Sequence, residues 1–320
     1  MRNFPRQCLG NAHGRNNLLS FLALRIRENT LLFVPMQGGG MEIIMKKFKV
    51  GLQLYSIRED MAKDMDAALK AVKDMGYECV EFAGFFDKSA EEVKALLDKY
   101  DLDAISVHQG MDPWLENGQK AIDYLKKVGV RYCAIPWFDK EKLADPVEFK
   151  ATMESFTAFG KALKENGIQL LYHNHDFEFE KVDGEYIFDR IYSAVPEDIL
   201  RPEMDTCWVH YAGVNPCEYI EKYSGMKLLH LKDFVCKNLG GGPVYALIGD
   251  NSDEAKPASQ EDNGFEFRPV GSGIQDFPAI LASAEKAGID CVIVEQDGHP
   301  ERSAMEDARI SIEYLRSLGI

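Results

Sequence analysis

The sequence predicts an α/β protein in which eight strand–helix units close a parallel barrel. Three observations lead to this prediction. Short, almost continuously apolar segments alternate with segments of helical spacing from Lys46 to the C-terminus, as in parallel sheets covered by helices. Eight such units in 320 residues suit a (β/α)8 or TIM barrel, which typically needs about 250 residues. No GxGxxG motif follows the first strand, which disfavours an open dinucleotide-binding sheet.

The predicted strands are apolar segments bounded by turns, and the predicted helices carry apolar residues at helical spacing. The strands are residues 48–55, 79–82, 104–108, 132–136, 168–172, 200–205, 227–231 and 290–295. The helices are residues 64–75, 89–100, 115–128, 146–166, 185–195, 216–223, 274–287 and 301–318. Gly76 and Gly129 directly follow two of these helices, at the position where glycine commonly ends a helix. Ser89 is the expected N-cap of the second helix.

Two segments do not follow this alternation. Residues 1–45 are rich in arginine, and we expect them to be an N-terminal extension, with translation starting at Met41 or Met45. The single barrel domain is then expected to span residues 46–320. Residues 234–269, after the seventh strand, are too long for an ordinary connection of about 2–6 residues. We expect this long loop to form a lid or rim over the barrel mouth.

Composition excludes several classes of partner. The net charge is −15, and no basic patch opposes it, so nucleic acid and anionic membranes are poor partners. No apolar run reaches the roughly 18 residues of a membrane span. The 7 cysteines include no CxxC motif, which fits reduced thiols in the cytoplasm better than a disulfide framework.

Metal-ligand and acid/base residue types gather where the predicted strands end. His173 and His175 follow the fifth strand, and they point the same way because side chains alternate along a strand. Asp205, His230 and Glu295 stand at the ends of the next three strands. The C-terminal ends of parallel barrel strands meet on one face. Two imidazoles and two carboxylates there suit a divalent ion such as Mn²⁺, Zn²⁺ or Fe²⁺.

Several motifs together resemble the sugar phosphate isomerase/epimerase family, whose members are xylose isomerase-like TIM barrels. The resemblance extends from about Val50 to the C-terminus. The motifs are YHNHDFEF at 172–179, EMDTCW at 203–208, LHLKD at 229–233, VGSG at 270–273 and VEQD at 294–297. Any one of these motifs would be a weak signal, whereas the set is specific.

The resemblance implies one divalent metal ion, of the Mn²⁺, Zn²⁺, Mg²⁺ or Fe²⁺ type, at the ends of strands five to eight. The family usually holds it with Glu, Asp, His and Glu. Matched onto this chain, the four ligands are His173, Asp205, His230 and Glu295. His173 departs from the usual glutamate. An imidazole can ligate, but once it is bound it has little capacity to accept a proton, so the family's two-base epimerisation is in doubt here.

The resemblance also suggests catalytic roles. Glu295 is the leading base, while His108, His175 and Glu178 are candidates for the acid or for holding sugar hydroxyls. Lys232 can supply positive charge to a developing oxyanion or to a phosphate.

Three functions remain open. The first is a metal-dependent sugar or sugar phosphate isomerase/epimerase, which removes a proton next to a metal-polarised carbonyl. The second is a metal-dependent lyase or hydratase acting on a 3-keto-sugar or 3-keto-glycoside, and the third is a non-catalytic sugar-binding barrel. Each takes a small carbohydrate as its partner. The sequence does not specify which sugar is bound, whether it is phosphorylated, or which metal is used. It is compatible with a monomer or a homo-oligomer.

Overall fold

Eight parallel strands close a barrel in the computed structural model, which describes residues 48–240 and 263–320. Around the barrel the hydrogen-bonded order is β1-β12-β9-β8-β5-β4-β3-β2. The strands are β1 (Lys49–Gln53), β2 (Cys79–Phe82), β3 (Asp103–His108), β4 (Tyr132–Ile135), β5 (Gln169–His173), β8 (Leu200–Asp205), β9 (Leu228–Leu231) and β12 (Cys291–Val294). The predicted TIM barrel is therefore confirmed. The predicted N-terminal extension lies outside the described residues.

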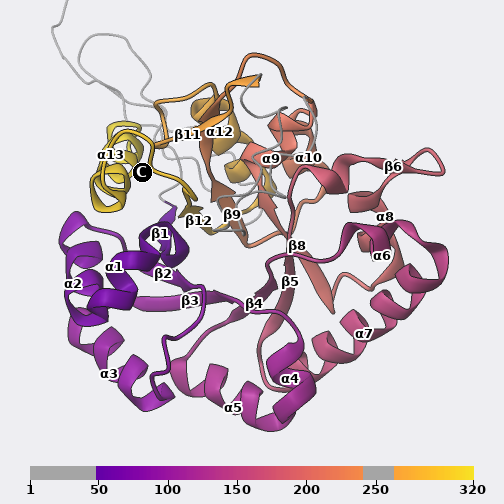
Figure 1. The fold of residues 1–320 in the computed structure, drawn as a ribbon, viewed down its shortest axis with the longest axis horizontal. Helices are drawn as coiled ribbons and strands as arrows, with labels where there is room; N and C mark the ends of the chain where they lie inside the picture. Colours follow the sequence, from indigo (N-terminus) through magenta and orange to yellow (C-terminus); the bar gives the residue numbers. More distant parts are fainter. Residues whose placement is uncertain (1–47, 241–262) are drawn as a thin grey trace, which may run out of the picture. The chain divides into compact units, whose positions relative to one another are not determined.

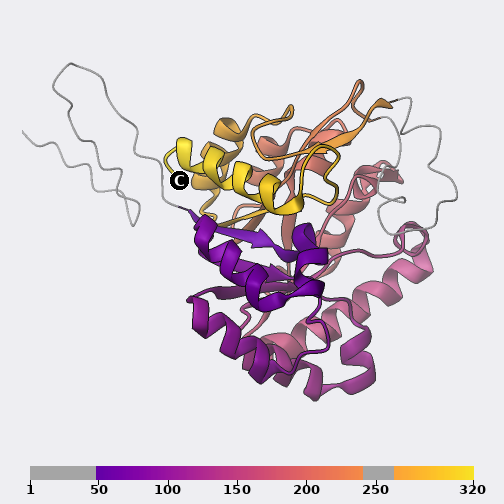
Figure 2. The same ribbon diagram turned by 60° about the vertical axis from the view of Figure 1, so that its left-hand side comes forward.

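Helices surround the barrel in sequence order, from the indigo α1 to the yellow α13 (Figure 1). They are α1 (Arg58–Lys63), α2 (Met65–Met75), α3 (Ala90–Tyr100), α4 (Asp112–Asn117), α5 (Gln119–Val128), α6 (Lys140–Ala144), α7 (Pro146–Glu165), α8 (Ile187–Ala194), α9 (Thr206–Tyr211), α10 (Pro216–Lys222), α12 (Phe277–Ala287) and α13 (Ala304–Ser317). The C-terminal α13 lies beside the N-terminal helices and completes the ring (Figure 2). No helix in the described part of the chain is long and apolar enough to cross a membrane.

Several predicted boundaries differ from the structure by a few residues, and two further differences have a clear local reason. The first strand stops at Gln53, whose side-chain oxygen accepts a hydrogen bond from the Tyr55 backbone N–H at 3.0 Å. This bond starts a 3-10 turn, Leu54–Ile57, that bends the chain over the barrel mouth. The predicted helix 115–128 is two helices, α4 and α5, separated at Gly118, whose φ of 53° does not continue a helix.

The barrel interior is filled by apolar side chains below the C-terminal ends of the strands. We call this group of buried residues the lower layer; its members are Cys79, Ile105, Ala134, Leu171, Leu228, Cys291 and Ile293. The packing leaves no room at Gly51 on β1, where an added Cβ would lie 2.6 Å from Ile293 Cδ1. The lower layer is thus a filled core rather than a channel.

Two short strands begin and end the long connection after β9. β10 (Asp233–Val235) pairs with β11 (Glu266–Arg268) in an antiparallel ladder. The Asp233 carboxylate accepts hydrogen bonds from the backbone N–H groups of Gly271 and Gly273 and so holds the return of the chain to the barrel. Most of the segment 234–269, which was predicted to form a lid or rim, lies outside the described residues, since residues 241–262 are not described. A second hairpin, β6 (Lys181–Val182) with β7 (Glu185–Tyr186), follows β5.

Candidate metal centre at the barrel mouth

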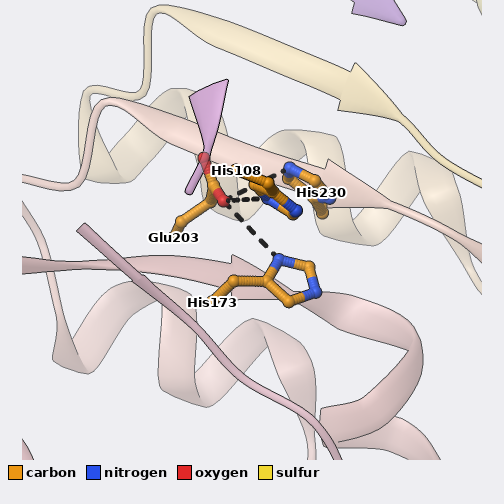
Figure 3. A group of neighbouring side chains, drawn as sticks. All are labelled: His108, His173, Glu203 and His230. Carbon is orange, nitrogen blue, oxygen red and sulfur yellow. Dashed lines mark hydrogen bonds and ion pairs between the residues drawn. The ribbon is translucent and has the colours of Figure 1, made fainter. Parts of the chain in front are cut away.

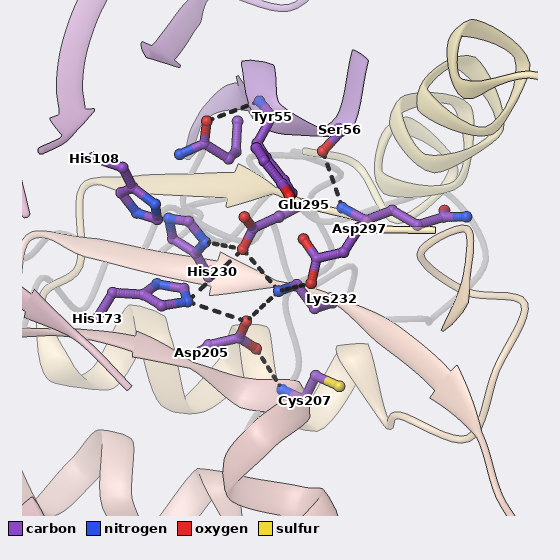
Figure 4. A network of polar contacts seen from close by, with 12 residues as sticks. Tyr55, Ser56, His108, His173, Asp205, Cys207, His230, Lys232, Glu295 and Asp297 are labelled. Atoms are coloured by element: carbon purple, nitrogen blue, oxygen red, sulfur yellow. Dashed lines mark hydrogen bonds and ion pairs between the residues drawn. The ribbon is translucent and has the colours of Figure 1, made fainter. Parts of the chain in front are cut away.

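The four residues predicted as metal ligands lie together just above the lower layer. His173 ends β5, Asp205 ends β8, His230 lies in β9 and Glu295 directly follows β12. One nitrogen or oxygen atom from each lies within 4.8 Å of the other three, and all four residues are buried (Figure 4). Register explains part of this meeting, since Asp205 pairs with His230 across the β8–β9 ladder.

The distances in this cluster suit a small cation. His173 Nε2 lies 3.7 Å from Asp205 Oδ2 and 3.9 Å from Glu295 Oε2. His230 Nδ1 lies 2.9 Å from the same Glu295 oxygen. Ligand atoms about 2.0–2.2 Å from a tetrahedral Zn²⁺ stand roughly 3.3–3.6 Å apart. Small side-chain movements would therefore bring all four atoms to ligand distance, and the donor set of two imidazoles and two carboxylates fits the ion.

The two carboxylate oxygens of Asp205 have different partners. Its Oδ1 accepts a hydrogen bond from the Cys207 backbone N–H at 2.8 Å and so caps α9. Its Oδ2 faces His173. Asn174 fixes the backbone beside it, because the Asn174 side-chain oxygen accepts from the Asp205 N–H at 3.0 Å. Helix capping and cluster formation are thus performed by different oxygens of one carboxylate.

Lys232 is a buried cation that contacts two members of this cluster. Its Nζ lies 2.9 Å from Glu295 Oε2, 2.9 Å from Asp297 Oδ2 and 3.1 Å from Asp205 Oδ2. Burial alone would lower the pKa of Lys232, but these carboxylates raise it well above its ordinary value. Burial likewise would raise the pKa of Glu295, yet Lys232 and His230 hold it well below the usual range. The ammonium is therefore charged, and its charge is already compensated.

Two further glutamates lie beneath the ligand cluster. Glu81, at the end of β2, accepts hydrogen bonds from Gln53 Nε2 at 2.8 Å and faces His230 Nε2 at 2.7 Å. Glu203, in β8, places Oε2 2.8 Å from His108 Nε2. Burial would raise the pKa of Glu81, but His108 and His230 lower it to about 2. Burial and the Glu81 charge raise the pKa of Glu203 to about 7.

Glu203 was not among the predicted site residues, although the sequence carried a signal for it. Glu203 precedes Asp205 by two residues and therefore shares its inward face. Arg58 and Ser56 were also missed. Arg58 Nη1 donates to the backbone oxygens of Tyr55 and Asp297, both at 3.1 Å, and Ser56 Oγ accepts from the Gln296 N–H. These bonds fasten the turn after β1 to the end of β12.

A cavity of about 370 Å³ opens above the ligand cluster. Its lining residues come from the ends of seven barrel strands, all but β8, and from the loops that follow them. They are Tyr55, Ala83, Gly84, His108, Pro136, Trp137, His173, His175, Lys232, Glu295 and Asp297. Both lining carboxylates follow β12, whereas the lining imidazoles come from β3 and the end of β5, across the barrel. Trp137 is half exposed and forms an apolar wall with Pro136.

The remaining predicted catalytic residues separate into two groups. His175 and His108 line the cavity, as a contact with substrate requires. Burial and Lys232 lower the pKa of His175 well below its ordinary value, so it is neutral. Burial would lower the pKa of His108 too, but Glu81 and Glu203 raise it.

Glu178 is not among the residues that line the cavity, so its predicted role at the substrate gains no support from this geometry. The 3-10 turn Phe177–Phe179 directs its carboxylate back into the protein. There its two oxygens meet the Tyr172 hydroxyl at 2.6 Å and the His175 backbone N–H at 2.8 Å. Burial raises the pKa of Glu178 to about 8. Its place indicates that it holds the loop that carries His175.

Comparison with known sequences and structures agrees with this geometry. A barrel with acid/base and metal-ligand residues at the C-terminal ends of its strands is typical of TIM-barrel enzymes. The sequence model of the family described as xylose isomerase-like TIM barrel matches residues 69–318. The chain therefore belongs to the xylose isomerase-like TIM barrel family.

Two of the similar proteins carry the names of enzymes that act on sugars or polyols, and a third binds zinc. The inosose dehydratase of Mesomycoplasma hyopneumoniae is 23% identical over 301 residues, which cover 86% of this chain and 97% of the relative. A sugar phosphate isomerase/epimerase structure from Parabacteroides distasonis has a TM-score of 0.66 at 23% identity and covers 89% of this chain and 98% of its own. The zinc-bound structure of the IolI protein has a TM-score of 0.59 at 17% identity, and the match covers 84% of this chain and 97% of the IolI chain. With the buried ligand cluster, these relatives identify the chain as an enzyme.

Proposed function

We propose that this protein is a metal-dependent lyase that eliminates water or a glycosidic group from an uncharged keto-sugar. The observation that carries the proposal is the asymmetry of the cavity. Both lining carboxylates stand on the β12 side, and imidazoles face them from across the barrel. Epimerisation by two carboxylate bases needs one on each face of the sugar, whereas elimination needs one base and one acid.

One divalent ion fits the site, held by His173, Asp205, His230 and Glu295. When bound, it would polarise a carbonyl oxygen and acidify the neighbouring C–H bond. The mixed imidazole and carboxylate donors favour Zn²⁺, Mn²⁺ or Fe²⁺ over Mg²⁺. The zinc in the related IolI structure supports the same choice.

The side chains supply the base and the acid. The Glu295 carboxylate takes the proton from the carbon next to the carbonyl, and the C–H electrons form a carbon–carbon double bond. On elimination the C–O bond at the following carbon breaks with its electrons on the departing oxygen. His108, whose pKa is raised by Glu81 and Glu203, gives that oxygen a proton. His175 is neutral and faces the cavity, where it binds a hydroxyl group.

The charge balance of the cavity favours an uncharged sugar. Among the described lining residues, Lys232 is the one lysine or arginine, and three carboxylates lie within 3.1 Å of its Nζ. An ammonium that is already compensated in this way offers little to a phosphate dianion. The Trp137 and Pro136 wall suits the apolar face of a sugar ring. Relatives named inosose dehydratase support a keto-polyol or keto-sugar substrate.

A second candidate is an isomerase or epimerase. The name of the Parabacteroides distasonis structure favours it, as does the position of His175 across the cavity from Glu295, where it could serve as a second base. Both candidates start with the same proton abstraction. They differ in whether a C–O bond then breaks.

The deciding experiment follows candidate substrates by NMR in D₂O with Mn²⁺-loaded or Zn²⁺-loaded protein. The substrates are an inosose, an aryl 3-keto-glucoside and a ketose phosphate. Release of water or of the phenol supports the lyase. Deuterium incorporation with an intact carbon skeleton supports the isomerase or epimerase, and turnover of the phosphate alone contradicts the uncharged substrate. A protein that binds metal but causes neither change contradicts both candidates.

A further inference from the structure

Glu81 and Glu203 lie below the metal-ligand cluster, fully buried and outside the cavity lining. Each directs an oxygen at an imidazole of the ligand set. Glu203 Oε2 lies 3.6 Å from His173 Nδ1, and Glu81 Oε2 lies 2.7 Å from His230 Nε2. Figure 3 shows one oxygen of the Glu203 carboxylate facing all three imidazoles, those of His108, His173 and His230. Neither glutamate could reach a substrate without passing these rings.

The two imidazoles use opposite ring nitrogens in this arrangement. His173 turns Nε2 toward Asp205 and Glu295, and leaves Nδ1 toward Glu203. His230 turns Nδ1 toward Glu295, and leaves Nε2 toward Glu81. Within the described part of the chain, buried His173 Nδ1 has no hydrogen-bond partner, and the Glu203 carboxylate faces it from 3.6 Å, just beyond hydrogen-bond distance.

A neutral imidazole carries one N–H and one lone pair. The outer nitrogens, His173 Nε2 and His230 Nδ1, face the proposed ion, and the inner nitrogens, His173 Nδ1 and His230 Nε2, face the glutamates. When the outer nitrogens donate their lone pairs to an ion, the proton of each ring must sit on its inner nitrogen. Carboxylates that accept from those inner N–H groups fix the tautomer and make the outer nitrogen a stronger donor.

We propose that Glu203 and Glu81 are positioning residues that hold His173 and His230 in opposite tautomers, Nδ1–H and Nε2–H. Both rings then present a lone pair to the same ion. The inference rests on the metal centre of the proposed function. It adds that the ion's affinity depends on two carboxylates that do not touch it.

A second ion beneath the first is the competing interpretation, because His108, His173, Glu203 and His230 also bring ligand atoms within 4.8 Å of one another. The two groups share His173 and His230. Filling both sites would require each shared neutral ring to bind through both nitrogens and to lose its one N–H proton. The geometry therefore favours one ion with two supporting glutamates.

The test measures Zn²⁺ affinity by chelator competition, and Zn²⁺ stoichiometry by elemental analysis, at pH 8. Glu203→Gln keeps an acceptor without charge and should bind Zn²⁺ about 10-fold more weakly, while Glu203→Leu should lose about 100-fold. Glu81→Gln should resemble Glu203→Gln. Asp189→Asn is the control, because the largely buried Asp189 carboxylate on α8 bonds to Tyr219, Tyr223 and Lys222 at and after α10, rather than to the ligand cluster or to residues next to it in the chain. It should leave Zn²⁺ affinity within about 2-fold.

Two readouts separate positioning from general damage to the fold. The effect of Glu203→Gln should disappear in a His173→Gln background, because the ring through which it acts is gone. Long-range ¹H–¹⁵N NMR of Zn²⁺-loaded protein should show His173 protonated at Nδ1 and His230 at Nε2. Unchanged affinity in Glu203→Leu, the same tautomer in both rings, or two Zn²⁺ ions per chain would overturn the inference. Absence of Zn²⁺ binding by the wild type would instead contradict the proposed metal centre itself.

Discussion

The lower layer of the barrel interior and the ligand cluster above it are built from the same strands. Leu171 and His173 are two residues apart on β5, as are Leu228 and His230 on β9. Side chains two apart on a strand share a face, about 6.6 Å from each other along it. A single step of this repeat therefore changes the barrel interior from packed core to candidate active site.

The two levels should contribute oppositely to stability. The lower layer removes apolar surface from water, which stabilises the fold. The upper level, by which we mean the ligand cluster with Lys232, buries carboxylates, imidazoles and an ammonium group. Burying charge costs free energy even when the charges are paired. Substitutions at the two levels should therefore separate metal binding and activity from stability.

The largest effect is expected from Asp205→Ala. Removing a carboxylate ligand should abolish stoichiometric metal binding, while the barrel stays folded because the lower layer is untouched. Elemental analysis and thermal unfolding measure the two properties. His230→Ala should behave in the same way. Wild-type metal content in both variants would exclude this site.

Glu295→Gln should separate chemistry from binding at the upper level. The amide can still offer an oxygen to the ion but cannot take a proton. Turnover at saturating Mn²⁺ should fall by about 10²–10⁴-fold, the usual contribution of a positioned general base.

His173→Gln is the matched comparison for Glu295→Gln. It should weaken metal binding, and excess Mn²⁺ should restore much of its activity, whereas added metal cannot replace a missing base. If Glu295→Gln stays active while His175→Gln is inactive, the base lies on the β5 side of the cavity.

Leu171→Ala tests the lower level. Leu171 is buried in the lower layer, and truncating such a side chain typically costs about 2–5 kcal/mol of unfolding free energy. Urea unfolding should show this loss, while the metal affinity of the folded protein should stay within a few-fold of wild type. A loss of metal binding without a loss of stability would contradict the division between the two levels.

The smallest effect is expected from Glu178→Gln. Burial raises the pKa of Glu178 from 4.5 to about 8, so the folded protein retains a proton that the unfolded chain releases in this range. The Glu178 contribution to stability is therefore present below pH 4.5 and is lost as the pH rises to about 8.

Melting temperatures from pH 5 to 9 check this expectation. The Gln variant should gain stability relative to wild type as the pH rises. Glu154→Gln, on an exposed face of α7, is the control and should leave the pH dependence unchanged. A constant difference between Glu178→Gln and wild type would show that Glu178 is ionised throughout.

The sequence by itself determined the barrel and which strand residues face its interior. Apolar alternation, helix-ending glycines and the count of strand–helix units are local properties, so they can be read without knowing the fold. His173, Asp205, His230 and Glu295 were predicted as metal ligands because the C-terminal ends of parallel barrel strands meet on one face, and the structure brings these four side chains together.

The tertiary structure decided which polar side chains meet and which turn away. His230 meets Glu81 149 positions away, a contact set by the closure of the barrel. Glu178 is turned inward by a short 3-10 turn, although it lies only five residues after His173. Contacts between distant strands and the direction of a loop side chain both depend on packing partners, which no local pattern in the chain specifies.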